Sequence, residues 1–572
     1  MKKVYFSIVL IAATLTNAQQ FQEIPTVFKD YSFSAAAIGD YNNDGFQDVF
    51  FTGAVDDGGL VTHNEFYKNT NGVFSVQQVF TDNAVHFNNG NVKFIDFDND
   101  GFLDVVSTGL SYGDVVNYQQ YRFKNNGETF DQIANTTGKI YGGIEVFDFN
   151  HDGQQDYAIN GVNFEGEETV YKLDLYSNTG GDFEKVDAWL PGSQSGDFKV
   201  ADFNNDHYLD VIMYGFDLNY SPFFRFYLND GEGSLVAAQE FTPLASGKMA
   251  FADFNADGFL DAIASGRNEN DEIVLKLLTN NGNGSFTESE ITEGALSESF
   301  IETGDINGDG YYDFVIIGDN DYNGFVNIFT YNPSSNSFDL QENTGIYNLG
   351  SGGTVKLFDY NNDHHLDVLT NGFDWNGAGY PSITKLYKNT TTEINEKPTA
   401  PQTLNTEVVE NKVIFHWENS SDDTTPEKAL RYELSVGSES GKADIAKYEV
   451  TTNGWFLDKT NLPQQIFWSV KSIDASHVLS ESSAEQTVDF LSVSENTALE
   501  FALYPNPAND VLNFKSKEKI KFAKIINIAG QVVQKQMVNG NKMQLNNLTS
   551  GLYIVEIQFE NGNIISRKFL KK

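Results

Sequence analysis

A nine-residue segment with Asp at positions one, five and nine and Asp or Asn at position three occurs seven times in the chain. The segments begin at residues 40, 96, 148, 202, 253, 305 and 359, at spacings of 51 to 56 residues. Self-similarity at a fixed period of this length is typical of repeat proteins, in which each repeat is one supersecondary unit. We therefore expect an array of similar units over this part of the chain.

Each repeat contains four short segments with the pattern of β-strands. In the second repeat, the strand pattern Val-Lys-Phe-Ile at 92–95 precedes the Asp segment, and a second strand pattern, Val-Val-Ser at 105–107, leads to a glycine at position 109. The first repeat then shows a third run, an Asn/Gly turn at 69–72 and a fourth run at 73–80. Four short strands per repeat of this length are typical of a β-propeller blade.

The two ends of the repeat array complement each other. The seventh repeat stops after its third strand pattern at 383–388, whereas residues 21–28 precede the first repeat and resemble the fourth strand at 74–80. We expect the N-terminal strand to complete the last blade, which leaves no open edge between blades. The sequence therefore predicts an all-β fold with a seven-bladed β-propeller over residues 19–390.

The Asp segments offer oxygen ligands at loop positions one, three, five and nine, and a glycine at position six permits a sharp turn in five of the seven. Hard oxygen donors in this number suit Ca²⁺, which takes six to eight of them. The alternative is a set of metal-free Asx turns. Three carboxylates close together are unfavourable without a cation, which favours up to seven structural Ca²⁺ sites.

His207 and His364 replace the glycine and are interpreted as turn residues. The predicted ligands are Asp40, Asn42, Asp44, Asp48, Asp96, Asp98, Asp100, Asp104, Asp148, Asn150, Asp152, Asp156, Asp202, Asn204, Asp206, Asp210, Asp253, Asn255, Asp257, Asp261, Asp305, Asn307, Asp309, Asp313, Asp359, Asn361, Asp363 and Asp367.

The charge of the chain follows this motif. The net charge is −43, of which residues 19–392 carry −41, and 22 of their 57 acidic residues belong to the Asp segments. Such acidity argues against a nucleic-acid partner and against docking on anionic lipid, because both need clustered Lys and Arg. The absence of Cys excludes disulfides, thiolate metal sites and Cys nucleophiles.

A ligand face is expected opposite the Asp segments, where the loops between the second and third strands vary in sequence. Aromatic side chains beside Asp and Asn suit a sugar or an extended peptide, although they could also pack on neighbouring loops. No HExxH, G-x-S-x-G or Walker A motif is present, but a pair of carboxylates acting as a glycosidase or lyase stays open. The predicted ligand-binding residues are Tyr112, Phe164, Tyr220, Tyr322, Trp375 and Tyr380.

Four further segments flank or follow the propeller. Residues 1–18 combine two lysines, a short apolar run and a small residue, as in a secretory signal peptide; a buried strand is the alternative. No later stretch approaches the 18 apolar residues of a membrane span. Residues 391–400 are predicted to be a linker, and residues 401–492 show alternating strand patterns with Trp417 as a core residue. Residues 493–572 form a further, less acidic module.

Three resemblances follow from these motifs. The Asp repeats over about residues 21–390 resemble the FG-GAP/VCBS repeats of integrin α-subunit propellers and of many secreted bacterial proteins. This resemblance implies that the metal is structural and that ligands bind on the opposite face. Residues 401–492 resemble a fibronectin type III domain through the strands at 413–417, 430–434 and 467–474.

The last module resembles the C-terminal sorting domain of the Bacteroidetes type IX secretion system. The matching motifs are YPNPA at 504–508, L-x-x-G-x-Y-x-V at 548–555 and a basic end. The resemblance implies passage through the outer membrane by the type IX machinery, followed by removal of the domain and release or attachment to surface lipopolysaccharide.

Three functions compete at this point. The leading hypothesis is a secreted or surface-attached binding or adhesion protein whose calcium-stabilised propeller recognises an extracellular glycan or protein. The second is a secreted polysaccharide-degrading enzyme on the same scaffold. The third is a structural surface component.

Overall fold

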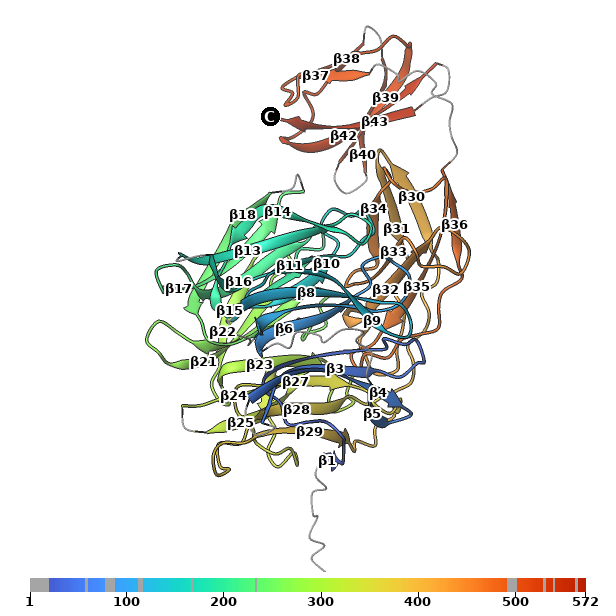
Figure 1. Cartoon of the computed structure of the whole chain (residues 1–572). Coiled ribbons are helices and arrows are strands. Elements are labelled where there is room, and N and C mark those ends of the chain that lie inside the picture. The colour runs from blue at the N-terminus through green and yellow to red at the C-terminus, as the bar shows by residue number, and fades with distance from the viewer. Residues whose placement is uncertain are drawn as a thin grey trace, which may run out of the picture. The chain divides into compact units, whose positions relative to one another are not determined.

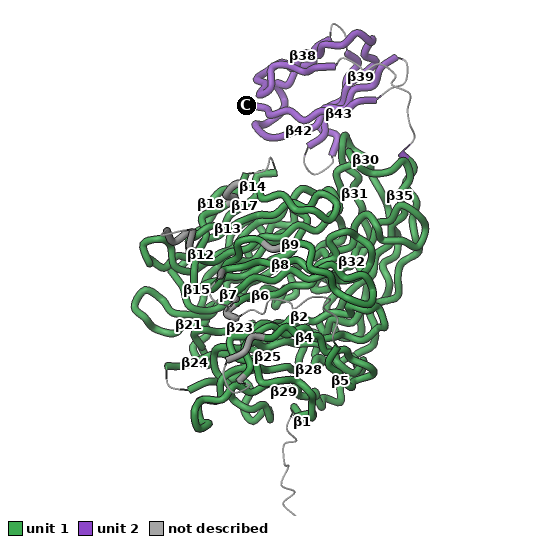
Figure 2. The backbone as a smooth tube through the Cα atoms, in the orientation of Figure 1, with its two compact units in different colours: residues 1–489 green, residues 490–572 purple. Residues whose placement is uncertain are grey.

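The computed structural model describes residues 20–56, 60–77, 88–111, 117–165, 168–231, 234–321, 323–490, 501–527, 531–538, 541–560 and 564–572. The chain divides into two compact units, residues 1–489 and 490–572 (Figure 2). The described residues form β-strands joined by turns, with one short 3-10 turn at Glu427–Ala429. The predicted all-β class is confirmed, whereas the predicted signal peptide at 1–18 lies outside the described residues.

Residues 20–389 form seven antiparallel sheets among the described residues, one for each Asp repeat, which we number in chain order (Figure 1). Sheet one contains β2 (Ser32–Gly39), β3 (Asp48–Asp56), β4 (Leu60–Thr70) and β5 (Val73–Gln77). Sheet two contains β6 (Asn88–Ile95), β7 (Asp104–Ser111), β8 (Asn117–Asn125) and β9 (Phe130–Thr137). Sheet three contains β10 (Ile144–Phe147), β11 (Asp156–Ile159), β12 (Val162–Glu165), β13 (Glu168–Asn178) and β14 (Phe183–Pro191). Sheet four contains β15 (Gln194–Ala201), β16 (Asp210–Phe216), β17 (Pro222–Asn229) and β18 (Leu235–Leu244).

The remaining sheets repeat this order. Sheet five contains β19 (Met249–Ala252), β20 (Asp261–Arg267), β21 (Ile273–Asn280) and β22 (Phe286–Ile291). Sheet six contains β23 (Ser297–Gly304), β24 (Asp313–Asp319), β25 (Gly324–Asn332) and β26 (Ser337–Leu340). Sheet seven contains β27 (Thr354–Phe358), β28 (Asp367–Phe373) and β29 (Ser382–Asn389), with β1 (Phe21–Ile24) as its outer strand.

The first strands of the sheets form a closed ring. Strands β2, β6, β10, β15, β19, β23 and β27 contact one another in this order, and β27 contacts β2. Strand β1 pairs antiparallel with β29, with Phe21 opposite Asn389, so the N-terminal strand completes the last sheet as the sequence predicted (Figure 1). A ring of four-stranded sheets around a central channel is a β-propeller.

Apolar side chains fill the space between neighbouring sheets. Between sheets four and five, for example, Ile212 and Phe226 pack with Ala262 and Leu278 in one buried cluster. This burial is the main stabilising term of such a fold, at roughly 25 cal/mol per Å² of apolar surface removed from water. Each sheet therefore presents apolar side chains on both of its faces, one toward each neighbouring sheet.

Asparagines at the ends of the third strands connect neighbouring sheets. Asn125 donates its backbone N–H to Asp104 at 2.7 Å and its side-chain Nδ2 to the carbonyl of Tyr41 in the preceding sheet at 2.7 Å. The same pair of hydrogen bonds recurs at Asn69, Asn178, Asn280 and Asn389. Each of these residues holds its own Asp loop and the neighbouring sheet together.

Residues 405–489 form a separate two-sheet sandwich within the first unit, which we call the sandwich domain. Its core contains Trp417, which is 3% exposed, with its ring 6.4 Å from that of Trp468. The predicted burial of Trp417 is confirmed, while the fibronectin type III assignment stays a prediction. One sheet contains β30 (Asn405–Val409), β31 (Lys412–His416) and β34 (Gly454–Asp458); the other contains β32 (Arg431–Gly437), β33 (Ala446–Val450), β35 (Gln465–Ile473) and β36 (Gln486–Asp489).

The second unit is also a pair of small sheets around its own apolar core. Leu512, Ile525, Val555 and Phe569 are buried in that core. One sheet contains β37 (Ala502–Tyr504), β38 (Val511–Lys515) and β41 (Lys542–Gln544). The other contains β39 (Ile520–Asn527), β40 (Val532–Met537), β42 (Gly551–Phe559) and β43 (Ile564–Lys571).

Candidate functional sites: the Asp loops and the channel mouth

The predicted metal ligands lie in seven loops that join the first and second strands of the sheets. In the second loop, Asp96 accepts hydrogen bonds from the backbone N–H groups of Asp100 at 3.1 Å and Gly101 at 3.0 Å. Asp104 accepts the N–H groups of Asn125 at 2.7 Å and Phe97 at 3.1 Å. These bonds fold the loop so that carboxylate oxygens of Asp96, Asp98 and Asp104 lie within 4.8 Å of one another.

Burial makes these carboxylates costly to ionise. Burial, together with the nearby carboxylates of Asp96 and Asp100, raises the pKa of Asp104 to about 8 despite the hydrogen bonds from Asn125 and Phe97, which lower it. The last Asp of other loops behaves in the same way, with a pKa of about 7 at Asp48 and about 8 at Asp156, Asp210, Asp261 and Asp367. A bound cation would remove this cost.

In three loops a lysine from the third strand supplies a positive charge. Lys68 lies 2.9 Å from Asp44, Lys124 lies 3.5 Å from Asp100, and Lys388 lies 2.9 Å from Asp363. The loops therefore attract a cationic group where the sequence offers one. Clustered hard oxygen donors that draw a cation fit a divalent ion such as Ca²⁺, and the metal itself stays a prediction.

The two histidines at position six adopt the positive φ that glycine has at this position in the other loops. His207 and His364 have positive φ angles of 69° and 67°, and their backbone N–H groups donate to Asp202 at 2.8 Å and Asp359 at 2.7 Å. The ring of His364 contacts the carbonyl of Asn395 at 3.0 Å. These contacts agree with their interpretation as turn residues.

The sandwich domain covers the face that carries the Asp loops. Asn99 of the second loop donates to the carbonyl of Ile445 at 2.8 Å, and Tyr448 donates its hydroxyl to Asp148 at 3.4 Å. In the sixth loop, the backbone N–H of Asp305 donates to the carbonyl of Ala475 at 2.8 Å. The loops of several sheets thus form one docking platform for the sandwich domain.

His151 belongs to this docking surface. Its ring stacks on Phe456 at a centroid distance of 4.0 Å, and its backbone carbonyl accepts the N–H of Asp458 at 2.7 Å. Burial lowers the pKa of His151 to about 3, so the ring is neutral at physiological pH. The histidine serves domain packing, which sequence reasoning could not show because its partners lie about 300 residues away in the chain.

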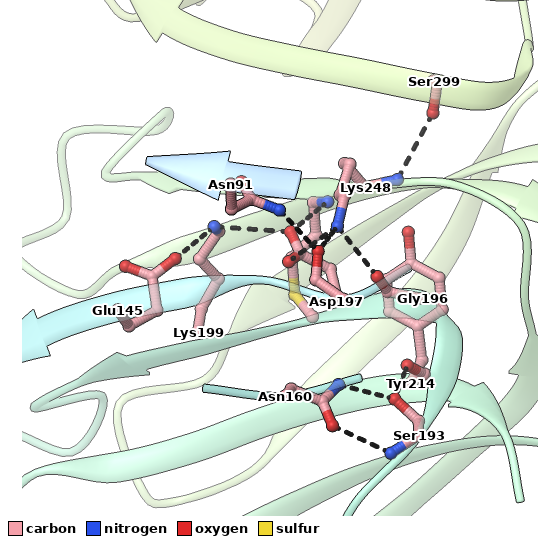
Figure 3. A network of polar contacts seen from close by, with 12 residues as sticks. Asn91, Glu145, Asn160, Ser193, Gly196, Asp197, Lys199, Tyr214, Lys248 and Ser299 are labelled. Atoms are coloured by element: carbon pink, nitrogen blue, oxygen red, sulfur yellow. Dashed lines mark hydrogen bonds and ion pairs between the residues drawn. The ribbon is translucent and has the colours of Figure 1, made fainter. Parts of the chain in front are cut away.

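Charged side chains line the central channel inside the ring. In each sheet, one residue stands three positions before the Asp loop. Among the described residues, six of these seven residues line a cavity of about 310 Å³. Lys199 bonds to Glu145 at 2.5 Å and lies 3.3 Å from Asp197, as Figure 3 shows. The Lys199–Glu145 pair bridges neighbouring sheets, the Lys199–Asp197 pair lies within β15, and both compensate charges that the channel buries.

The opposite end of the channel opens into a second cavity of about 400 Å³, which we call the mouth. All seven sheets contribute to it through residues at the beginnings of their first strands. Because the Asp loops follow the other ends of these strands, the mouth lies on the face that the sandwich domain leaves uncovered.

The predicted ligand-binding aromatics stand apart from the mouth. Tyr220, Trp375 and Tyr380 are 66%, 38% and 59% exposed on the loops after the second strands, and none of them lines the mouth cavity. Phe164 lies in β12, and its side chain is outside the described residues, as are Tyr112 and Tyr322. A role for these six residues in binding stays a prediction.

Sequence reasoning missed the residues that form the mouth, although a signal was present. Seven positions before the Asp loops stand Phe33, Asn89, Tyr141, Ser195, Ser246, Glu298 and Gly352, and the next residue is always Gly or Ser. Gly196 shows why, because a Cβ atom there would lie 2.0 Å from the carbonyl oxygen of Tyr214. Alignment of the repeats upstream of the Asp loops could have revealed this second motif.

Family comparisons agree with both the repeats and the last unit. Residues 40–107, 96–159 and 253–316 match the FG-GAP-like repeat. Residues 502–572 match the secretion system C-terminal sorting domain. No curated protein is significantly similar in sequence to this chain.

Solved structures give only distant similarities. The extracellular domain of a candidate hybrid two-component system of B. thetaiotaomicron is 12% identical, with a TM-score of 0.35, 82% of this chain covered and 57% of that chain covered. The exotype rhamnogalacturonan lyase YesX is 14% identical, with a TM-score of 0.38 and coverages of 65% and 76%. The six-bladed fucose-binding lectin of Aleuria aurantia is 9% identical, with a TM-score of 0.34 and coverages of 56% and 99%. No functional conclusion follows at TM-scores below 0.5.

The location of the protein follows from its last unit. The sorting domain directs type IX secretion to the cell surface or the medium. In the part of the chain that the structure describes, no helix has the length and apolarity needed to cross a bilayer. The chain therefore combines a β-propeller that contains FG-GAP-like repeats with a C-terminal sorting domain of the type IX secretion system.

Proposed function

We propose that this protein is a secreted or surface-attached binding protein whose calcium-stabilised propeller recognises an extracellular glycan or protein. The observation that carries the proposal is the unequal use of the two propeller faces. The sandwich domain occupies the Asp-loop face through Ile445, Tyr448 and Ala475. The opposite face keeps a cavity of about 400 Å³, a size that suits small ligands.

The lining of this cavity favours binding over hydrolysis. Glu298 is the one carboxylate among the described residues that line the mouth. A glycosidase of the common type needs two carboxylates on either side of the scissile bond. Deeper in the channel, Glu145 and Asp197 are held by Lys199 and Lys248.

Calcium has a folding role in this proposal. Several Asp loops contact the sandwich domain, and the loops carry carboxylates such as Asp104 whose pKa is raised by burial. Ca²⁺ would supply the positive charge that these carboxylates lack, and Asp96, Asp98 and Asp104 would hold it in the second loop. The ligand site and the metal sites thus lie at opposite ends of the first strands.

Glycan arrays and matrix-protein arrays probed with the mature full-length chain in millimolar Ca²⁺ test the proposal. We expect retention on at least one glycan or protein, and loss of retention after chelation. A parallel panel of polysaccharides is analysed for released products. Product release without retention on either array would contradict the proposal and favour the enzyme hypothesis.

A further inference from the structure

Residues at the position seven before the Asp loop border the mouth, and we call the residues at this position the rim. The described rim residues are Phe33, Tyr141, Ser195, Ser246, Glu298 and Gly352, and all of them except Ser246 line the mouth cavity. Backbone hydrogen bonds connect them from sheet to sheet. Ser195 donates its N–H to the carbonyl of Tyr141 at 2.8 Å, Ser246 donates to Ser195, and Glu298 donates to Ser246 at 2.7 Å.

The rim backbone has a conformation that disfavours large side chains. The φ angles are 50° at Phe33, 56° at Tyr141, 48° at Ser195, 60° at Ser246 and 47° at Glu298. In this left-handed region the Cβ atom crowds the following carbonyl, so glycine is the residue that fits without strain. Gly352 shows that the rim accepts glycine, with a φ of 85°.

Two aromatic residues occupy this unfavourable position without being buried. Phe33 is 38% exposed and Tyr141 is 50% exposed, although both line the mouth. Backbone strain combined with an exposed aromatic ring lowers stability, so folding does not explain their presence. Strained residues of this kind gather at binding sites, where a ligand provides the compensating contact.

The rim combines two kinds of side chain. Phe33 contacts Phe373 at a ring distance of 5.3 Å, and the ring of Tyr141 also lines the mouth. Sheets four and six contribute Ser195 and Glu298, whose side chains offer hydroxyl and carboxylate oxygens. A pyranose ring has matching surfaces, because its C–H face stacks on aromatic rings and its hydroxyls donate to such oxygens.

The charges around the mouth select against an acidic ligand. The ammonium of Lys248 is bonded to the carbonyls of Gly142 and Gly196 and lies 3.6 Å from Asp197, so its charge is already compensated (Figure 3). Glu298 adds a negative charge at the rim, and residues 19–392 carry a net charge of −41. Like charges repel, which leaves neutral saccharides favoured over uronates or sulfated sugars.

We propose that the mouth binds a neutral saccharide residue through the aromatic rings of Phe33 and Tyr141 and the side-chain oxygens of Ser195 and Glu298. This inference rests on the proposed binding function and specifies both its site and its ligand class. A competing binding site on the same face would be formed by the loops after the second strands, which carry the exposed residues Tyr220 and Tyr380.

Glycine substitutions separate ligand contact from folding. Tyr141→Gly and Phe33→Gly remove a ring and relieve a positive φ, so melting temperatures should stay within a few degrees of the wild type. Asn71→Gly is the control for relief of a positive φ, because Asn71 is exposed, has a φ of 51° and lies in the turn between β4 and β5, at the Asp-loop end of the sheet. Tyr220→Gly and Tyr380→Gly test the competing site on the outer loops, because these tyrosines are exposed and have φ angles of 56° and 52°.

Binding of the mature full-length chain to cellohexaose, xylohexaose, mannohexaose and laminarihexaose is measured by calorimetry in millimolar Ca²⁺, with polygalacturonate as the acidic comparison. We expect one neutral hexasaccharide to bind, with affinity at least tenfold lower in each rim variant and unchanged in Asn71→Gly. Loss of affinity in Tyr220→Gly or Tyr380→Gly alone would move the site to the outer loops and overturn the inference.

Two further outcomes would also contradict the inference. The first is stronger binding to polygalacturonate than to every neutral hexasaccharide. The second is the absence of neutral-saccharide binding in a protein that is retained on a protein array, which would refute the saccharide site while leaving the proposed binding function intact.

Discussion

The two ends of the propeller's first strands show opposite patterns in the same set of repeats. At one end, every sheet carries an Asp loop with Asp at the first, fifth and ninth positions. At the other end, the rim position holds phenylalanine, tyrosine, serine, glutamate or glycine in different described sheets. The uniform end is covered by the sandwich domain, and the variable end surrounds an open cavity.

This difference indicates that the two ends of the first strands have different roles. A uniform loop satisfies a requirement shared by all sheets, which here is to fold clustered carboxylates and present a flat docking surface. A variable rim gives each sheet a different side chain at one site, which is what recognition of an asymmetric ligand needs. The following predictions test whether the Asp-loop end serves folding and domain docking alone.

The largest expected effect is that of metal removal. In the absence of divalent cations, buried carboxylates such as Asp104 and Asp156 repel their neighbours, whereas each occupied site adds about 2.7 kcal/mol at a Ca²⁺ concentration of 100 times its Kd. We expect the first unit to melt roughly 10 °C lower in chelator than in millimolar Ca²⁺, as followed by differential scanning calorimetry. Identical melting of metal-free and Ca²⁺-loaded protein would contradict a metal role.

A smaller effect is expected at the docking surface. Gly310 occupies position six of the sixth loop with a φ of 85°, and a Cβ atom there would lie 2.1 Å from the carbonyl oxygen of Thr424. Gly45 occupies the same position in the first loop with a φ of 88° and no atom within 4 Å. Gly310→Ala should therefore lower the free energy of unfolding by about 2 kcal/mol more than Gly45→Ala.

The Gly45→Ala variant isolates backbone strain, which the two substitutions share. Urea unfolding gives the free energies, and proteolysis between residues 391 and 400 reports loosening of the sandwich domain. Equal destabilisation of the two variants would show that domain docking contributes little, and it would weaken the contrast between the covered and open faces.

The smallest expected effect concerns pH. Burial lowers the pKa of His477 to about 3, with a further contribution from Arg431, and the pKa of an unfolded histidine is about 6.5. The folded state holds the neutral ring, so its stability is fully present above pH 6.5 and falls as the pH decreases toward 3. The slope approaches about 1.4 kcal/mol per pH unit only well below pH 6.5, so the expected loss between pH 6.5 and pH 5 is about 1.6 kcal/mol.

His477→Asn removes this titration and suits the φ of 64° at this position. The wild type should lose stability relative to the variant between pH 6.5 and pH 5, as measured by urea unfolding. Taking the difference between the two proteins cancels Asp474, whose pKa is raised to about 6 by burial and which acts in the opposite direction. Parallel pH profiles would contradict a lowered pKa at His477.

Local patterns were sufficient to predict much of this molecule. The Asp repeat, the alternation of strands and the unmatched segment at 21–28 predicted the sheets and the pairing of β1 with β29. The YPNPA and L-x-x-G-x-Y-x-V motifs predicted the sorting domain that the family comparison supports. These features are readable because hydrogen bonding and burial within one repeat depend on residues that are close together in the chain.

Only the tertiary structure decided which face of the propeller is open. The contacts of His151 with Phe456 and of Asp305 with Ala475 join residues from different domains, and no local pattern specifies such pairs. The mouth is likewise a property of the closed ring, because Phe33, Tyr141 and Glu298 become neighbours of one cavity only when all sheets surround it. Sequence alone determined the repeating units and their Asp loops, while ring closure and domain docking determined where a ligand has access.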